Sequence, residues 1–256
     1  MLVLCYGMQK SGSTLAFEMV SGILQSAGFE QPLVYNDLRD PAEARRNYIN
    51  TITQDKISGL IETIGSGRKI AVKTHATLPN DLFAWMEDRQ RKQEIQVITS
   101  CRDPRDVCLS LLDAGEKARK QNANAFSTFK TLDDTAGFVR GRIARFRKWS
   151  ALQGTLRLNY DTVAYVPEKA IDAIERALGV TCKRERVLKH AFEDAYTQKN
   201  KARRHRYLEE MTEQQQRELT ELFHRFIANA CESDRQSWYD KCRDNVLAGG
   251  NLDSRP

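Results

Sequence analysis

Short apolar runs alternate with amphipathic segments along most of this chain. Aliphatic and β-branched runs at residues 2–6, 69–73 and 95–101, and an alternating stretch at 155–160, predict strands because each is too short for a helix. Apolar positions recur at helical spacing from residue 13 onward and over residues 80–91, 105–112, 138–152, 167–178 and 212–230. This alternation predicts an α/β fold, a single domain in which helices flank a central, mostly parallel sheet.

Some segments are expected to differ from this regular core. Residues 113–137 are polar, and we expect a mobile insertion there that can act as a lid. In residues 138–152 we expect the arginines and the lysine to form a solvated face over an apolar stripe. The domain should span residues 1–248, with a frayed tail at 249–256.

Composition places the chain among ordinary globular proteins and narrows its chemistry. Of the 256 residues, 41% are hydrophobic and 29% charged, and no apolar stretch approaches the roughly 20 residues of a membrane span. The N-terminus also lacks the pattern of a signal peptide. The six cysteines are scattered without zinc-ligand spacing, which favours reduced thiols and no metal site. We therefore expect a cytoplasmic protein without stable membrane insertion.

The net charge of +6 favours an anionic partner. Basic residues are interspersed with acidic ones rather than gathered in a stripe, so we expect no nucleic-acid partner and favour a small polyanion.

The loop between the first strand and the first helix reads G-M-Q-K-S-G-S-T over residues 7–14. Amides at a helix N-terminus attract anions, so this position predicts an anion site, with an ordinary glycine turn as the alternative. In the nucleotide-binding P-loop, lysine follows the second glycine, but here Ser13 stands at that place and the positive charge is at Lys10. This difference matters because the P-loop lysine reaches the β- and γ-phosphates.

The same loop resembles the 5′-phosphosulfate loop of the sulfotransferases that use 3′-phosphoadenosine 5′-phosphosulfate (PAPS), commonly P-K-S-G-T-T-W. The matching positions are Lys10, Ser11, Gly12, Ser13 and Thr14. Gln9 and Leu15 stand where the family has proline and tryptophan. The resemblance implies that these loop residues bind PAPS, whose product is adenosine 3′,5′-bisphosphate (PAP).

Two further strand ends carry the resemblance. Lys73 and His75 lie in a K-T-H sequence similar to that of cytosolic sulfotransferases, which implies that His75 is the general base and that Lys73 assists Lys10 in stabilising charge. Arg102 and Ser110 match the R-N-P-x-D-x-x-x-S segment, which implies that they bind the 3′-phosphate. From its chemistry alone, Arg102 offers a planar fork to phosphate, and the alternative is an ion pair with a nearby aspartate.

Two later segments resemble the family less closely. The residues around Tyr160 are similar to its Y-E-D-L segment, which implies that Tyr160 lies beside the adenine; a core tyrosine is the alternative. The basic stretch at 199–206 stands where the family has a glycine-containing loop near R-K-G-x-x-G-x-W, but it lacks glycine. The resemblance implies that Arg203 or Arg204 binds the 3′-phosphate, and a solvated basic turn is the alternative.

Together these segments imply a sulfotransferase that moves a sulfuryl group from PAPS to a hydroxyl or amine acceptor, without a metal. The acceptor can be a small molecule, a lipid or a glycan, because acceptor pockets are built from variable loops. The sequence gives no indication of the oligomeric state. Two other classes remain open: a P-loop kinase or other nucleotide-dependent enzyme, for which Asp103 would hold magnesium, and a noncatalytic protein that binds polyanions.

Overall fold

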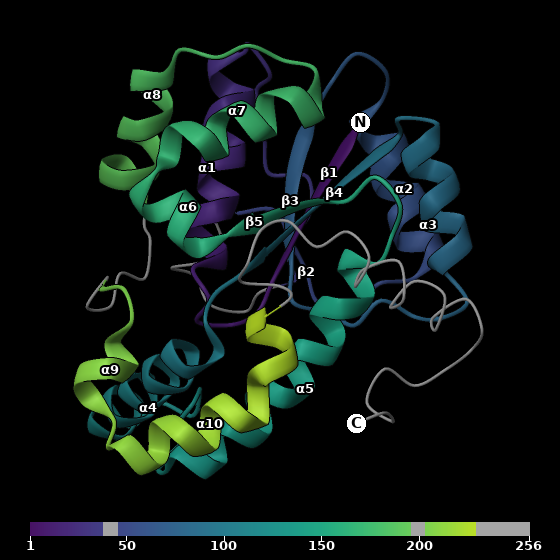
Figure 1. Ribbon diagram of the computed structural model, residues 1–256. Coiled ribbons are helices and arrows are strands. Elements are labelled where there is room, and N and C mark those ends of the chain that lie inside the picture. Colours follow the sequence, from purple (N-terminus) through teal and green to yellow (C-terminus); the bar gives the residue numbers. More distant parts are fainter. Residues whose placement is uncertain (38–45, 196–202, 229–256) are drawn as a thin grey trace.

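A five-stranded parallel sheet forms the centre of the computed structural model, which describes residues 1–37, 46–195 and 203–228 (Figure 1). The strands are β1 (Leu2–Gly7), β2 (Tyr48–Ile49), β3 (Ile70–Thr74), β4 (Ile95–Cys101) and β5 (Leu156–Asn159). Their order across the sheet is β2-β3-β1-β4-β5. The expected fold class is confirmed.

Helices connect the strands and cover both faces of the sheet. They are α1 (Ser13–Ser26), α2 (Gln54–Ile64), α3 (Phe83–Arg91), α4 (Pro104–Lys120), α5 (Leu132–Ser150), α6 (Tyr160–Tyr165), α7 (Pro167–Leu178), α8 (Arg184–Lys189), the π-helix η1 (His190–Asp194), α9 (Arg206–Glu210) and α10 (Glu213–Phe226). In Figure 1, α1, α6, α7 and α8 lie on one side of the sheet and α2 and α3 on the other.

The central strand β1 serves both hydrophobic cores. All six of its residues are buried, as expected for a parallel strand that is covered on both faces. Because side chains alternate along a strand, Leu2, Leu4 and Tyr6 pack on the α2 and α3 side, while Val3 and Cys5 pack against α1. The fold therefore depends on β1 more than on any edge strand.

Helices α4, α5 and α10 gather beyond the end of the sheet where β1 stops (Figure 1). Trp149 holds α5 there, because its ring stacks on Tyr6 at 5.6 Å between centroids. Its indole Nε1 also donates a 2.9 Å hydrogen bond to the carbonyl of Ala76, just after β3. This anchor places the side of α5 that carries Trp149 against the carboxyl edge of the sheet.

The segment 113–137 is more helical than its polar composition indicates. Helix α4 continues to Lys120 and α5 already begins at Leu132, so only residues 121–131 lie outside helices. Arg119 on α4 donates to the carbonyls of Ser127 and Phe129, and a capping box at Thr131 starts α5. Movement of these residues as a lid stays a prediction.

The structure also contains several elements that the sequence analysis did not predict, namely β2, α2, α6, α8, η1 and α9. Helices expected at 80–91 and 212–230 begin or end a few residues inside those limits, at Phe83 and Phe226. The expected tail at 249–256 lies outside the described residues. Across the described ranges, no helix is long and apolar enough to cross a bilayer.

Candidate active site

The predicted site residues follow the carboxyl ends of neighbouring strands. In the sheet register, Tyr6 of β1 lies opposite Thr74 of β3, and Gly7 lies opposite Ser100 of β4. The chain therefore leaves β1, β3 and β4 at the same edge, with the first strand between strands that come later in the sequence. In open α/β sheets, ligands bind at the carboxyl edge beside such a change in strand order.

The loop after β1 is held in a tight turn that opens the start of α1. The amide and the hydroxyl of Ser11 both donate to the carbonyl of Met8, at 3.2 and 2.7 Å. Lys10 (φ 64°) and Gly12 (φ 82°) both adopt left-handed backbone, which is unusual for lysine and easy for glycine. No described side chain caps α1 and its first turn has no acidic residue, so its first amides are available to an anion.

Tyr160, the first residue of α6, packs directly on this loop. A Cβ atom placed on Gly12 would lie 2.3 Å from the ring of Tyr160, so only glycine fits there. Arg102 directly follows β4, and its guanidinium carbon lies 4.4 Å from the centroid of the same ring. The tyrosine ring therefore connects the loop to the arginine.

Arg102 is buried and partly paired. Its Nη2 donates to Asp106 at 2.9 Å and to the carbonyl of Arg203 at 2.8 Å. The ion pair with an aspartate, the alternative considered from the sequence, is thus present. Its Nε is also buried and has no partner among the described residues, which leaves one donor for another group.

One side of α4 extends from the neighbourhood of Arg102 toward the loop after β1. Asp106, Ser110 and Asp113 follow at intervals of four and three residues, which places them on one side of the helix. Ser110 is buried. The negative charge of Asp113 interacts electrostatically with Lys10. Burial lowers the pKa of Lys10, and Asp113 opposes that shift. The predicted residues Ser110 and Lys10 thus belong to the same surroundings.

His75 is oriented by the backbone of the loop. Its Nδ1 lies 2.5 Å from the carbonyl oxygen of Gly7. A carbonyl only accepts hydrogen bonds, so Nδ1 carries the proton and Nε2 keeps its lone pair. Burial, helped by the charge of Lys73, lowers the pKa of His75 to about 3, and the imidazole is therefore neutral near pH 7.

Lys73 links the end of β3 to the start of α1. It is 4% exposed, and its Nζ donates a 2.7 Å hydrogen bond to the hydroxyl of Thr14. The loop, Lys73 and His75 thus form one connected group.

Of the basic stretch predicted at 199–206, residues 199–202 lie outside the described residues, and Arg203 and Arg204 lie beside this group. Arg203 accepts the hydrogen bond from Arg102 through its carbonyl, while its exposed side chain approaches Glu209 at 3.4 Å. Arg204 approaches Asp161 at 3.6 Å, next to Tyr160. A direct contact of either side chain with a phosphate stays a prediction.

Arg142 on α5 is a residue that the sequence interpretation assigned to a solvated helix face. That assignment is wrong for Arg142, which is half-buried, with its Nε buried and its guanidinium carbon 4.3 Å from the centroid of the Phe138 ring. Its positive charge reaches His75. Its spacing of seven residues from Trp149 is the sequence signal that could have placed it on the inner side of α5.

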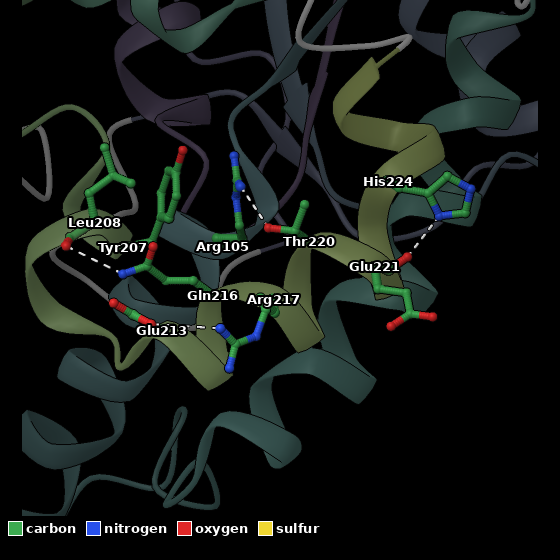
Figure 2. Close-up of a pocket in the computed structure, with 9 residues that line it drawn as sticks. All are labelled: Arg105, Tyr207, Leu208, Glu213, Gln216, Arg217, Thr220, Glu221 and His224. Atoms are coloured by element: carbon green, nitrogen blue, oxygen red, sulfur yellow. Dashed lines mark hydrogen bonds and ion pairs between the residues drawn. The ribbon is translucent and has the colours of Figure 1, made fainter.

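A separate open pocket of about 800 Å³ lies between α9, α10 and the start of α4 (Figure 2). Its lining includes Arg105, Tyr207 and Thr220, and none of the predicted site residues. The guanidinium of Arg105 pairs with the carboxylate of Asp103 and donates a hydrogen bond to the hydroxyl of Thr220. Its guanidinium carbon lies 3.6 Å from the centroid of the Tyr207 ring. These contacts join α10 to α4, and we assign them to stability rather than to the site.

Comparisons with known proteins agree with this arrangement. A sequence model of the family described as Sulfotransferase domain matches residues 2–236. No curated protein matches the sequence. Among solved structures, mouse sulfotransferase SULT7A1 complexed with PAP is similar, with 14% identity, a TM-score of 0.54, and coverage of 90% of this chain and 85% of that one.

A second similar structure is retinol dehydratase in complex with androsterone and inactive cofactor PAP. It has 17% identity and a TM-score of 0.54, and the match covers 92% of this chain and 82% of that one. At such identities the likeness of these two structures shows the fold.

Proposed function

Because the chain belongs to the sulfotransferase family, we propose that it transfers a sulfuryl group from PAPS to the hydroxyl or amine of an acceptor. The observation that carries this proposal is the contact chain from Gly12 through the ring of Tyr160 to Arg102. It joins two anion-binding features, the open start of α1 and a buried guanidinium, which suit a nucleotide with phosphate groups at both the 5′ and 3′ positions.

The residues present fit such a donor. The amides after Gly12, with Ser13 and Thr14, would hold the 5′ end, and Lys10 would add charge beside it. Arg102 would offer its unpaired Nε to the 3′-phosphate, with Ser110 close by on α4 and Arg203 or Arg204 at the rim. Tyr160 would lie along the nucleoside between them. When bound, the donor supplies the sulfuryl group.

His75 would remove the proton from the acceptor. Its Nε2 keeps a lone pair because Nδ1 is held by Gly7, so the acceptor O–H or N–H can pass its proton to Nε2 as the new bond to sulfur forms. Lys10 and Lys73 would offset the negative charge that grows on the leaving phosphate oxygen. No step in this proposal requires a metal.

The contacts of Asp103 disfavour the kinase alternative. Its carboxylate caps α4 through the amide of Arg105 and also receives two hydrogen bonds from the Arg105 guanidinium, at 3.0 and 2.6 Å. A carboxylate engaged in this way is poorly placed to hold the magnesium that a kinase needs at this strand end.

The acceptor class belongs to the proposal as well. We expect a small molecule, while a lipid or a glycan remains in the same proposal. The retinol dehydratase structure holds androsterone, a small molecule, together with PAP, and it identifies no acceptor for this chain.

Calorimetry with two ligands tests the donor assignment. We expect PAP to bind in the presence of a chelator, and ATP with magnesium to bind at least tenfold more weakly. Tight, chelator-sensitive binding of ATP together with absence of PAP binding would support the kinase alternative. A transfer assay with labelled PAPS and pooled hydroxyl and amine acceptors then tests the reaction itself.

A further inference from the structure

Two arginines of α5 lie on the side of that helix that faces the carboxyl edge of the sheet. Arg142, Arg145 and Trp149 follow at intervals of three and four residues, which places them on one side of the helix. Trp149 fixes the direction of that side, since it stacks on Tyr6 and donates to the carbonyl of the residue after His75. The positive charge of Arg142 accordingly acts on His75, and the charge of Arg145 acts on Tyr6, against which Trp149 stacks.

The position of Arg142 is defined by its contacts. Its guanidinium carbon lies over the ring of Phe138, 4.3 Å from the centroid, and Phe138 packs edge-on against Phe129 at 5.0 Å. Its charge reaches the phenols of Tyr6 and Tyr48 as well as His75. Tyr48 itself lies edge-on to His75, 5.9 Å between centroids.

These cations have no anionic partner in the part of the chain that the structure describes. Other buried arginines are matched there: Arg102 pairs with Asp106, Arg105 with Asp103, and Arg206 with Asp113. For Arg142 the neighbouring charged group is Arg145, and burial together with that like charge lowers the pKa of Arg142.

Holding two like charges in a half-buried place costs free energy unless an anion joins them. The buried, unpartnered Nε of Arg142 is a second, independent sign of a missing acceptor of hydrogen bonds.

The strand order shows that these arginines serve a different ligand from the one proposed for Arg102. Arg102 follows β4, on one side of β1, whereas Tyr48 of β2 and His75 after β3 lie on the other side. The positive charge of Arg142 interacts with His75 and Tyr48, on this second side of β1. An anion held by α5 is therefore on the acceptor side of the loop, away from the 3′-phosphate end of a donor.

We propose that the acceptor carries an anionic group, a carboxylate, sulfate or phosphate, which Arg142 and Arg145 bind while the acceptor hydroxyl lies at His75. This inference rests on the proposed function and names the acceptor class for that same site. Along α5, Arg145 and Arg142 stand about 6 and 10 Å from Trp149, at about 1.5 Å per residue. An acceptor the length of a substituted phenol can span that interval.

Charge neutralisation would couple acceptor binding to the base. The positive charge of Arg142 contributes to lowering the pKa of His75. An anion bound beside Arg142 would offset that contribution and raise the basicity of Nε2. The base would then be strongest when an anionic acceptor is bound.

Matched acceptors test the proposal with the full chain. In a transfer assay with PAPS, 4-hydroxybenzoate and 3-(4-hydroxyphenyl)propanoate are compared with their uncharged methyl esters, and 4-hydroxybenzenesulfonate tests a sulfonate in place of the carboxylate. We expect wild-type kcat/KM to favour at least one anionic acceptor over its ester by tenfold or more. Arg142→Gln should lower kcat/KM for that anion about 10- to 100-fold, the range for hydrogen bonds to charged groups. The esters should change less than about threefold.

Two control variants separate charge recognition from a general loss of structure. Arg142→Lys retains the charge and should recover part of the preference, whereas Arg140→Gln, an exposed position on the same helix, should leave all acceptors unchanged. Equal losses for acids and esters in Arg142→Gln, or a wild-type preference for the esters, would overturn the inference.

A binding measurement distinguishes this failure from failure of the proposed function. Calorimetry is performed with PAP first and then with the preferred anionic phenol added to the PAP complex. PAP binding without binding of any of the anionic phenols overturns the acceptor inference and leaves the donor assignment intact. Absence of PAP binding overturns the proposed function, and the acceptor inference with it.

Discussion

The imidazole Nδ1 of His75 and the carbonyl oxygen of Gly7 lie 2.5 Å apart, which connects the end of β3 to the end of β1. Because these strands are hydrogen-bonded neighbours, the position of the imidazole is set by the sheet rather than by a mobile loop. An imidazole held in this way has a fixed tautomer, as the general base that we propose requires.

Replacement of His75 should separate catalysis from donor binding. In His75→Ala we expect turnover to fall about 10²- to 10⁴-fold, the usual contribution of a general base. PAP affinity measured by calorimetry should stay within about threefold of wild type, because the imidazole is hydrogen-bonded to Gly7, before the loop residues that we propose to bind the donor. His224→Ala, at an exposed histidine of α10, is the control. Near-normal turnover in His75→Ala would assign the proton transfer to another group.

The same histidine should make folding stability depend on pH. Its pKa is about 3 in the folded protein and about 6.5 in an unfolded chain. Between these values the unfolded state binds the extra proton, so the free energy of unfolding falls as the pH is lowered through 6.5. From pH 7.5 to 5.0, urea unfolding of wild type should show a loss up to about 2 kcal/mol larger than that of His75→Gln. Equal losses in the two proteins would contradict the lowered pKa of His75.

Substitution at Gly12 should damage both the loop and its contact with Tyr160. Gly12→Ala combines a φ of 82° with a Cβ 2.3 Å from the tyrosine ring. Gly179→Ala provides the matched control, since that glycine, just after α7, is also in the left-handed region (φ 60°) and has open space around its Cβ position.

We expect thermal and urea unfolding to show a loss of about 1–2 kcal/mol in Gly179→Ala, from backbone strain alone. The loss in Gly12→Ala should be larger, and PAP affinity should fall at least tenfold in that variant only. Similar effects of the two substitutions would indicate that Tyr160 does not pack on the loop in solution.

Removal of the Arg102 guanidinium should affect recognition of the 3′-phosphate. In Arg102→Gln we expect PAP to bind about 10- to 100-fold more weakly, as for the loss of a hydrogen bond to a charged group. Adenosine 5′-phosphate, which lacks the 3′-phosphate, should change less than about threefold.

Because Arg102→Gln leaves Asp106 without its buried partner, the double variant with Asp106→Asn checks that the effect is not unfolding. A preference for PAP that persists in both variants would remove Arg102 from the donor site.

The strands and the position of the loop after β1 could be predicted from the sequence because their signals are local. Each apolar run of β1, β3 and β4 lies within one residue of its expected place, and the glycines mark where the first run ends. The tips of the strands then converge as a consequence of parallel pairing. Strand β2 has only two residues, Tyr48 and Ile49, and exists through its pairing with β3, so no local pattern could indicate it.

The acceptor side could not be predicted for a different reason. Whether an arginine of α5 faces water or the sheet depends on how that helix packs, and the stacking of Trp149 on Tyr6 determines this across more than a hundred residues of chain. A helix with charges on several sides carries no such information by itself. The pairing of Arg102 with Asp106, in contrast, joins residues one helical turn apart, and the sequence did suggest it.

Because β1 supplies alternate side chains to two cores and ends in the loop that we propose to bind the donor, occupancy of that loop would be energetically linked to the whole domain. A nucleotide that binds only the folded chain raises the melting temperature by mass action. Core variants weakened far from the loop should thus regain part of their thermal resistance at saturating nucleotide, and the protein inside a cell would be hardest to unfold while it holds its ligand.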